Sequence, residues 1–273
     1  MREVNRKIHN AKIVIALRTD LLDRVLAATS DAGFQDEKYR ALCLPLTWSR
    51  DTLEEVLELR INELVQHKYS GQRVRYTDLL PQTVGPQKER DIEYMLDRTL
   101  FRPRDIITFF NICMEHAVGE PKIRPQQLLA AEGEYSQARL RSLSDEWSVH
   151  YPHLLKLCRL LQRRPASFRL REIEDADLHE MYLDILVQEP IRMGEDYNQI
   201  QAFYDGKVKT STLRAFIAFV LHRVGVIGLK TGSHRQVVWS YLGQETVSLA
   251  EIDEHTSVHI HKMFWRALGI NPS

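Results

Sequence analysis

Apolar positions along the chain change from a short strand-like run to long helical patterns. Residues 13–17 are five apolar residues in succession, rich in β-branched side chains and too short for an independent helix. Such a run predicts a β-strand covered on both faces, as in a parallel sheet. The few residues before it cannot supply the neighbouring strands. We therefore expect the rest of that sheet to come from an upstream segment or from a partner chain.

Residues 48–164 carry apolar side chains at helical spacing. Ser49 is a suitable N-cap for a helix that has Leu53, Leu57 and Ile61 on one face. Pro103 and Pro125 stand where later helices are expected to begin, because proline is tolerated in the first turn. The pattern predicts a segment built of helices.

Pro165 marks the clearest boundary, because it ends one helical pattern and a new one starts after it. Three helices are then expected, at about 175–190, 197–206 and 213–225. Two β-type runs follow, 226–230 and 236–242, and the TGSHR between them predicts a hairpin around Gly232. Three helices followed by a hairpin is the order of a winged helix. Trp239 and Tyr241, which alternate on this hairpin, are expected to pack on the third helix.

Composition gives the protein no global electrostatic preference, because 37 basic residues balance 37 acidic ones. The cysteines, Cys43, Cys113 and Cys158, are far apart and lie in apolar patterns without metal-ligand spacing. They are interpreted as buried thiols in a reducing compartment. No signal peptide or membrane-spanning run stands out. We expect a soluble cytoplasmic protein that does not bind membranes.

Three short motifs carry a resemblance to a known class of protein. They are LRTD at 17–20, WSRDTLEEVLELRI at 48–61 and RPRDIITFFN at 102–111. Together they resemble the C-terminal half of bacterial P-loop ATPases of the AAA+-like STAND and KAP kinds. In those families a core strand ends in a polar "sensor 1" residue, and a helical lid carries a "sensor 2" arginine near a proline. A winged helix often follows. The resemblance covers about residues 12–117 by motif, and beyond them only the domain order agrees.

The resemblance implies a mainly α protein with three parts. Residues 1–47 would be a remnant of the α/β P-loop core, 48–164 the helical lid and 165–273 the winged-helix domain. The nucleotide-facing residues implied are Arg18 or Thr19 as sensor 1 and Arg104 as sensor 2, assisted by Arg102. An arginine in the first turn of a helix suits this role, since the free N–H groups and the guanidinium both favour phosphate. The alternative is that Arg104 forms an ordinary surface pair with Asp105, and Arg18 with Asp20.

The sequence departs from an ATPase at the most important place. It contains no GxxxxGK[ST], and the nearest look-alike, DGKVKTS at 205–211, lacks the first glycine. We expect no ATP hydrolysis by this chain alone, and ATP as a cofactor only if a missing Walker A and B half is joined to it. The expected partners are that upstream half or a second copy of the chain. The implied role is regulatory, and the family suggests defence against phage or signalling.

The winged-helix pattern supports an alternative function, in which this domain binds duplex DNA and the N-terminal part serves only as an oligomerisation scaffold. The third helix would enter the major groove and the hairpin would touch the backbone. The candidate contacts are Lys207, Lys209, Arg214, Lys230, His234 and Arg235. Basic residues between 156 and 171 would add phosphate contacts. The third helix is mostly apolar after Arg214, which leaves few side chains to read bases. A purely structural adaptor is the third possibility.

Histidines gather near the end of the sequence, at His255, His259 and His261. A metal site needs three or four converging ligands, and neither a cysteine nor a suitably spaced carboxylate accompanies them. We interpret them as hydrogen-bonded structural histidines and predict no metal. No serine or cysteine has the context of a catalytic nucleophile.

Overall fold

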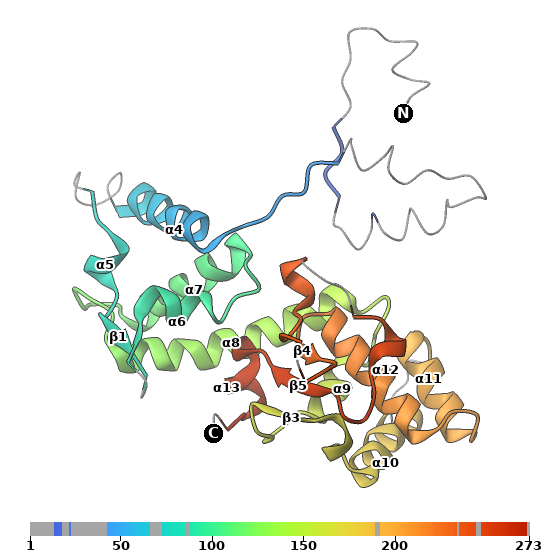
Figure 1. Ribbon diagram of the computed structural model, residues 1–273. Helices are drawn as coiled ribbons and strands as arrows, with labels where there is room; N and C mark the ends of the chain where they lie inside the picture. Colours follow the sequence, from blue (N-terminus) through green and yellow to red (C-terminus); the bar gives the residue numbers. More distant parts are fainter. Residues whose placement is uncertain are drawn as a thin grey trace, which may run out of the picture. The chain divides into compact units, whose positions relative to one another are not determined.

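The structure is mainly helical with two small sheets, which confirms the predicted fold class at that level. Figure 1 shows the computed structural model, which describes residues 14–17, 22, 43–65, 73–85, 88–188, 192–233, 235–243 and 247–271. The chain divides into two compact units, Met1–Thr47 and Trp48–Ser273. Among the helices of the described residues, none has the length and apolarity that a membrane span requires.

The predicted N-terminal strand is not formed in the part of it that the structure describes. Residues 14–17 have no regular secondary structure and are exposed. A strand that is apolar on both faces needs hydrogen-bonded neighbours and two covering layers. Among the described residues, no strand pairs with this run, so the predicted strand is not confirmed here. Arg18 and Thr19, the implied sensor 1 positions, lie outside the described residues.

The first half of the larger unit consists of helices around one short hairpin. Its elements are α4 (Arg50–Val65), α5 (Tyr76–Leu79), β1 (Thr83–Val84), β2 (Glu89–Arg90), α6 (Asp91–Leu96), α7 (Pro103–His116) and α8 (Pro125–Trp147). Ser49 caps α4 as predicted, since its Oγ accepts the N–H of Thr52 at 3.2 Å. Pro103 and Pro125 occupy the first turns of α7 and α8, which confirms both predicted starts. These starts are decided by local backbone chemistry.

The second half combines short helices with a three-stranded sheet. Its elements are α9 (Leu154–Arg159), β3 (Ser167–Arg169), η2 (Leu170–Glu172), α10 (Asp175–Leu183), η3 (Asp184–Gln188), α11 (Glu195–Tyr204), α12 (Thr210–Arg223), β4 (Ile227–Lys230), η4 (Ser240–Leu242), η5 (Leu249–Glu251), β5 (Ser257–Ile260), η6 (Lys262–Phe264) and α13 (Trp265–Leu268). The three predicted helices are therefore present, in order, as α10, α11 and α12.

The predicted hairpin is corrected by the sheet. Its strands are antiparallel in the order β3-β5-β4, so β4 pairs with β5 rather than with residues 236–242. From that segment only Val238 pairs with Leu229, through N···O contacts of 3.0 and 2.8 Å. Residues 240–242 then coil into η4. β5 is the better partner because its buried Val258 and Ile260 alternate with half-exposed His259, which matches the core face of β4.

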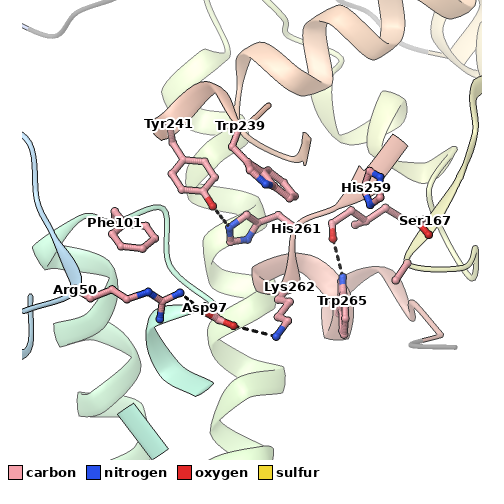
Figure 2. Close-up of a pocket in the computed structure, with 12 residues that line it drawn as sticks. Arg50, Asp97, Phe101, Ser167, Trp239, Tyr241, His259, His261, Lys262 and Trp265 are labelled. Carbon is pink, nitrogen blue, oxygen red and sulfur yellow. Dashed lines mark hydrogen bonds and ion pairs between the residues drawn. The ribbon is translucent and has the colours of Figure 1, made fainter. Parts of the chain in front are cut away.

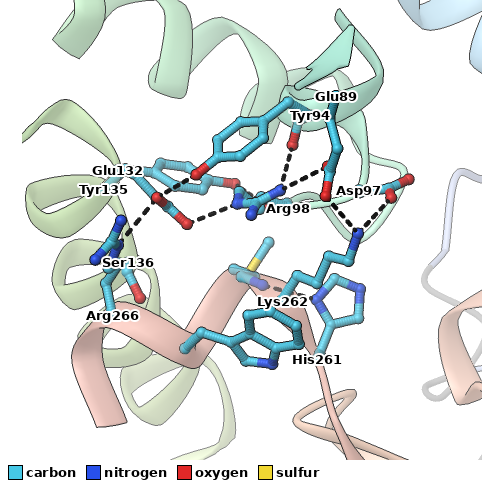
Figure 3. Close-up of polar contacts among 12 residues, drawn as sticks. Glu89, Tyr94, Asp97, Arg98, Glu132, Tyr135, Ser136, His261, Lys262 and Arg266 are labelled. Atoms are coloured by element: carbon cyan, nitrogen blue, oxygen red, sulfur yellow. Dashed lines mark hydrogen bonds and ion pairs between the residues drawn. The ribbon is translucent and has the colours of Figure 1, made fainter. Parts of the chain in front are cut away.

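Helix α8 connects the two halves through a buried ionic cluster (Figure 3). Glu132, in the first half of α8, is almost fully buried and accepts hydrogen bonds from Arg98 Nε at 2.6 Å and from Tyr94 Oη at 2.7 Å. On its other side Arg266 Nε of α13 lies 3.1 Å from Glu132 Oε2. The Arg98 guanidinium also lies over the Tyr94 ring, 3.3 Å from its centroid. One carboxylate thus joins the α6 region to the C-terminal helix.

Candidate functional site

Two arginines at the start of α7 share one carboxylate. Arg102 Nη1 lies 3.1 Å and Arg104 Nη2 3.0 Å from the same oxygen, Oε2 of Glu146 on α8. The Arg104 side chain is 55 % exposed, whereas that of Glu146 is only 12 % exposed. The implied sensor 2 residue Arg104 and its assisting Arg102 therefore lie together, at a helix end where anions are favoured.

A buried pair lies behind these arginines. Asp105 Oδ1 is 3.3 Å from Arg139 Nη2, and both side chains are buried. Asp105 Oδ2 accepts the backbone N–H of Leu100 at 3.2 Å. Burial raises the pKa of Asp105, against the opposing effect of Arg139. Three guanidinium groups thus face two carboxylates, Asp105 and Glu146, so the cluster is positive in sum and suited to an additional anion.

A second candidate site is the polar face of the C-terminal sheet. Arg169, Ser257 and Lys230 are direct cross-strand partners and form one row over β3, β5 and β4. Ser167 and His259 form the next row, with Gly228 in the third strand. Direct partners project to the same side of a sheet. The opposite side carries the buried residues Phe168, Val258 and Leu229. We call the side that bears Arg169 and Lys230 the sheet face.

A basic pocket of about 610 Å³ opens over one end of the sheet face. Arg169, Lys230 and Arg235 line it, with Asp253 as the carboxylate in its wall. Arg235 Nη1 lies 3.0 Å from Oε1 of Glu251, which is not among the residues that line the pocket. Lys230 makes no ion pair with any residue that the structure describes. The pocket therefore offers positive charge to an anionic ligand.

An aromatic pocket of about 300 Å³ lies next to it and shares His259 in its lining. The rings of Phe101, Trp239, Tyr241 and Trp265 line this pocket, and all four side chains are half-buried. Phe101 and Tyr241 are stacked with ring centroids 6.0 Å apart. Figure 2 shows Trp239 and Tyr241 beside the ring of His261. Rings of this kind, left half open, suit a flat ligand.

Three charged side chains form one wall of the aromatic pocket. Asp97 accepts hydrogen bonds from Arg50 at 2.5 Å and from Lys262 at 3.0 Å (Figure 2). Burial alone would raise the pKa of Asp97, but these two hydrogen bonds outweigh burial and lower it. Lys262 Nζ also lies 3.5 Å from Glu89 Oε1, so both cations of the wall are paired with carboxylates. Arg50 also lies over the Phe101 ring, 5.5 Å from its centroid.

Trp239 and Tyr241 were predicted to pack on the third helix, and the structure corrects this. Trp239 packs on the sheet at Gly228 and meets the His261 ring edge-on, with centroids 5.1 Å apart. Tyr241 contacts Phe101 and His261 instead. The reason is that residues 236–242 cross the sheet face instead of forming a regular strand paired with β4.

The predicted DNA contacts do not all lie together. Lys230 and Arg235 meet in the basic pocket, whereas His234 lies outside the described residues. Lys207 and Lys209 are exposed before α12, and Lys207 Nζ pairs with Asp205 at 2.9 Å.

Arg214 has a structural position that sequence reasoning missed. It is buried, pairs with Asp175, pairs with Glu254 at 2.8 Å, and donates to the Ile173 carbonyl at 2.8 Å. Its guanidinium is occupied inside the fold and has no free edge for a phosphate. Helix α12 as a whole is a core helix, exposed only at Ser211 and Thr212. This argues against a helix that enters the major groove.

The basic run between 156 and 171 is also largely committed to internal contacts. Lys156 and Arg159 both pair with Asp184, at 2.5 and 2.9 Å, and Arg164 pairs with Asp177 at 2.5 Å. Arg169 is the member of this run that reaches the basic pocket. The residues of the aromatic pocket had no common signal in the sequence, because Phe101, Trp239 and Trp265 come from distant segments.

The described residues contain no group of histidine, cysteine, aspartate and glutamate side chains placed to hold a metal ion. Of the three clustered histidines, His261 is a hydrogen-bonded structural residue, as predicted. Its Nδ1 accepts the N–H of Met263 at 3.1 Å, and its Nε2 lies 3.1 Å from Tyr241 Oη.

Comparison with known families adds one finding. Residues 51–144 match a family described as a FunZ-associated C-terminal helical domain. The match covers α4 to most of α8 and therefore includes Arg102 and Arg104. Curated proteins give no match, and neither do solved structures.

Proposed function

We propose that this chain is the regulatory part of a P-loop ATPase of the AAA+-like STAND or KAP kind. It would consist of a remnant of the α/β core, a helical lid and a winged-helix domain. A segment or partner with Walker A and B motifs would hold ATP and Mg²⁺. The chain itself would sense the γ-phosphate and pass that state to a partner or to nucleic acid, in a bacterial defence or signalling system.

The observation that carries this proposal is the pair of arginines on Glu146. Both contact one carboxylate oxygen, and Arg104 remains more than half exposed. A phosphate presents the same kind of oxygen with more charge, so it can replace Glu146 as the acceptor. In that mechanism the arginines leave Glu146 when ATP is presented and return to it after hydrolysis. The matched family, described as a C-terminal helical domain, supports a role for these helices beside another domain.

The winged-helix assignment rests on order and topology. Helices α10, α11 and α12 precede β4 and β5, and β3 completes an antiparallel sheet in the order β3-β5-β4. The long connection between β4 and β5 takes the place of the wing. Because α12 is buried, this domain would act through its sheet face or as a docking module rather than through a recognition helix.

The test is ATP-dependent association with a protein that carries a Walker A motif. The full-length tagged chain is incubated with lysate of its own source and Mg-ATP or Mg-ADP, and captured proteins are identified and then purified. We expect an ATP-dependent partner with a GxxxxGK[ST] motif. Arg104→Ala should weaken its ATP-dependent binding by about 10- to 100-fold, the value of one charge-assisted hydrogen-bonded contact.

Arg141→Ala is the matched control, because Arg141 is an exposed arginine on α8. It should leave the association unchanged. Binding that is equal with ATP and ADP, or insensitive to Arg104→Ala, contradicts nucleotide sensing at this site. The chain alone should not hydrolyse ATP.

A second candidate function is binding of nucleic acid at the sheet face. The observation that favours it is the basic pocket, where Arg169 comes together with Lys230 and Arg235 from a separate segment. Phosphate contacts are the main source of affinity in such complexes, and they release counterions. The corresponding measurement is the salt dependence of binding to nucleic acid.

A further inference from the structure

We infer that the aromatic pocket holds an unstacked nucleobase while the adjoining basic pocket holds the backbone phosphates, so that the ligand of the sheet face is single-stranded nucleic acid. This inference rests on the second candidate function and makes it more specific. The sequence predicted duplex DNA as the nucleic-acid partner. The geometry of the sheet face favours the single strand.

The first step is the juxtaposition of the two pockets. His259 lines both, and it stands at the centre of the sheet between Ser167 and Gly228. The row Arg169, Ser257 and Lys230 lies two residues further along the strands, on the same side. Rings and cations therefore lie side by side along one surface. Proteins that bind single strands combine the same two features, a positive groove for the backbone and aromatic rings for the bases.

The second step is that the aromatic pocket suits one flat group. Its volume of about 300 Å³ is at the small end of ligand pockets. Phe101, Trp239, Tyr241 and Trp265 are only half-buried, so ring surface remains available. The cations Arg50 and Lys262 in the wall both face Asp97, and Lys262 also lies 3.5 Å from Glu89, so a network of ion pairs borders the ring stack.

The third step concerns Phe101, which holds a strained backbone. Its φ of 52° is in the left-handed region, which is unfavourable for a bulky side chain. The strain is located in the turn between α6 and α7, and this turn brings the ring against Tyr241 and under Arg50. Strained residues are concentrated at binding sites, and here the strain accompanies a ring at the mouth of a pocket.

The fourth step excludes a duplex as the preferred ligand. In a duplex the bases are paired and stacked, so none can enter the aromatic pocket without being flipped out. The helix that would read a groove, α12, is exposed only at Ser211 and Thr212. A duplex would be held by phosphate contacts alone. A single strand gains base stacking as well.

The test compares a fluorescein-labelled dT12 with a duplex of the same length, using the full chain at 50 mM and 200 mM salt. We expect dT12 to bind more tightly than the duplex and to quench the fluorescence of Trp239 and Trp265. Phe101→Gly should weaken dT12 binding by about 5- to 100-fold, the range of one base-aromatic stack. It should leave duplex binding unchanged. Phe101→Tyr, which keeps the ring, should retain the affinity.

Phe101→Gly is suited to this test because glycine adopts the positive φ without strain, which offsets the lost packing. Tyr204→Ala is the control, since Tyr204 is an exposed ring at the end of α11. Lys230→Ala should weaken both ligands and reduce the salt slope by about 0.7 to 0.9.

The outcomes distinguish binding of a base in the aromatic pocket from binding of phosphates at the sheet face. Equal affinity for dT12 and duplex, no tryptophan quenching, or no effect of Phe101→Gly overturns the base pocket. In those cases a Lys230 effect on the salt slope still supports phosphate binding at the sheet face. If neither ligand binds at 50 mM salt, both the inference and the second candidate function are wrong.

Discussion

His261 lies just after β5. Its buried imidazole is hydrogen-bonded to the backbone and also lines the aromatic pocket. Its Nδ1 accepts the Met263 N–H, so the neutral ring carries its proton on Nε2 and donates it to Tyr241 Oη. Burial lowers the pKa of His261 to about 3. A second proton would have to go to Nδ1 and would break the contact with Met263. This residue therefore links protonation to stability.

We predict that His261 makes the protein less stable in mild acid. The unfolded chain takes up this proton near pH 6.5, while the folded chain does so only near pH 3, so stability falls as the pH decreases through this window. Between pH 7.5 and pH 5 the loss from this group is about 2 kcal/mol. Urea unfolding at both pH values should show this loss in the wild type but not in His261→Gln. Equal losses in the two proteins would mean that other groups cause it.

The C-terminal sheet requires glycine at position 228, whereas α8 has room for a side chain at position 133. Gly228 in β4 has no room for a side chain, since an added Cβ would lie 2.6 Å from Val237 Cγ1 and 2.8 Å from Trp239. Gly133 in α8 has nothing within 4 Å of an added Cβ. The absence of a side chain at Gly228 is what allows residues 237–239 to cross the sheet and form the aromatic pocket.

The two glycines give a matched pair of predictions. Gly228→Ala should lower the free energy of unfolding by about 1 to 3 kcal/mol, because it overpacks the sheet against Trp239. Gly133→Ala should raise it by about 0.5 to 1 kcal/mol, since alanine is the better helix residue. Chemical denaturation of both variants measures the difference. A neutral Gly228→Ala would mean that residues 237–239 are not packed on β4.

At the scale of the whole molecule, α8 holds together the unit Trp48–Ser273. It packs on α7 and β1, and also on α9, η6 and α13. Glu132 supplies the polar part of this connection between Arg98 and Arg266. Buried ion pairs contribute little net stability when intact, but removal of one partner leaves an uncompensated charge.

We predict that Glu132→Leu lowers the free energy of unfolding by about 3 to 5 kcal/mol, because Arg98 would remain buried without its main partner. The wild type should unfold in one transition, since α8 packs against elements of both halves of the unit. Glu134→Gln is the control on the same helix. Glu134 is 58 % exposed and pairs with His116 at 3.1 Å, so its loss should cost at most about 0.5 kcal/mol. Separate transitions for the two halves would contradict this picture.

Part of the candidate site could be predicted from sequence because it is local. Arg102 and Arg104 flank a proline that fixes the start of α7, so their place at a helix end follows from neighbouring residues. Lys230 and Arg235 are close in sequence and remain close in the basic pocket. The role of Arg214 could not be predicted, because its carboxylate partners, Asp175 and Glu254, lie about 40 positions away in both directions.

Local patterns were sufficient to predict the helical character of the chain, the starts of α4, α7 and α8, and the order of the last three long helices. Capping and the fixed φ of proline act within one turn, so the amino-acid sequence states them directly. Long-range packing, in contrast, causes β4 to pair with β5, α12 to be largely buried, and Phe101 to contact Tyr241. These contacts join residues far apart in the chain, and they depend on which apolar faces can be covered together, a property that no local pattern records.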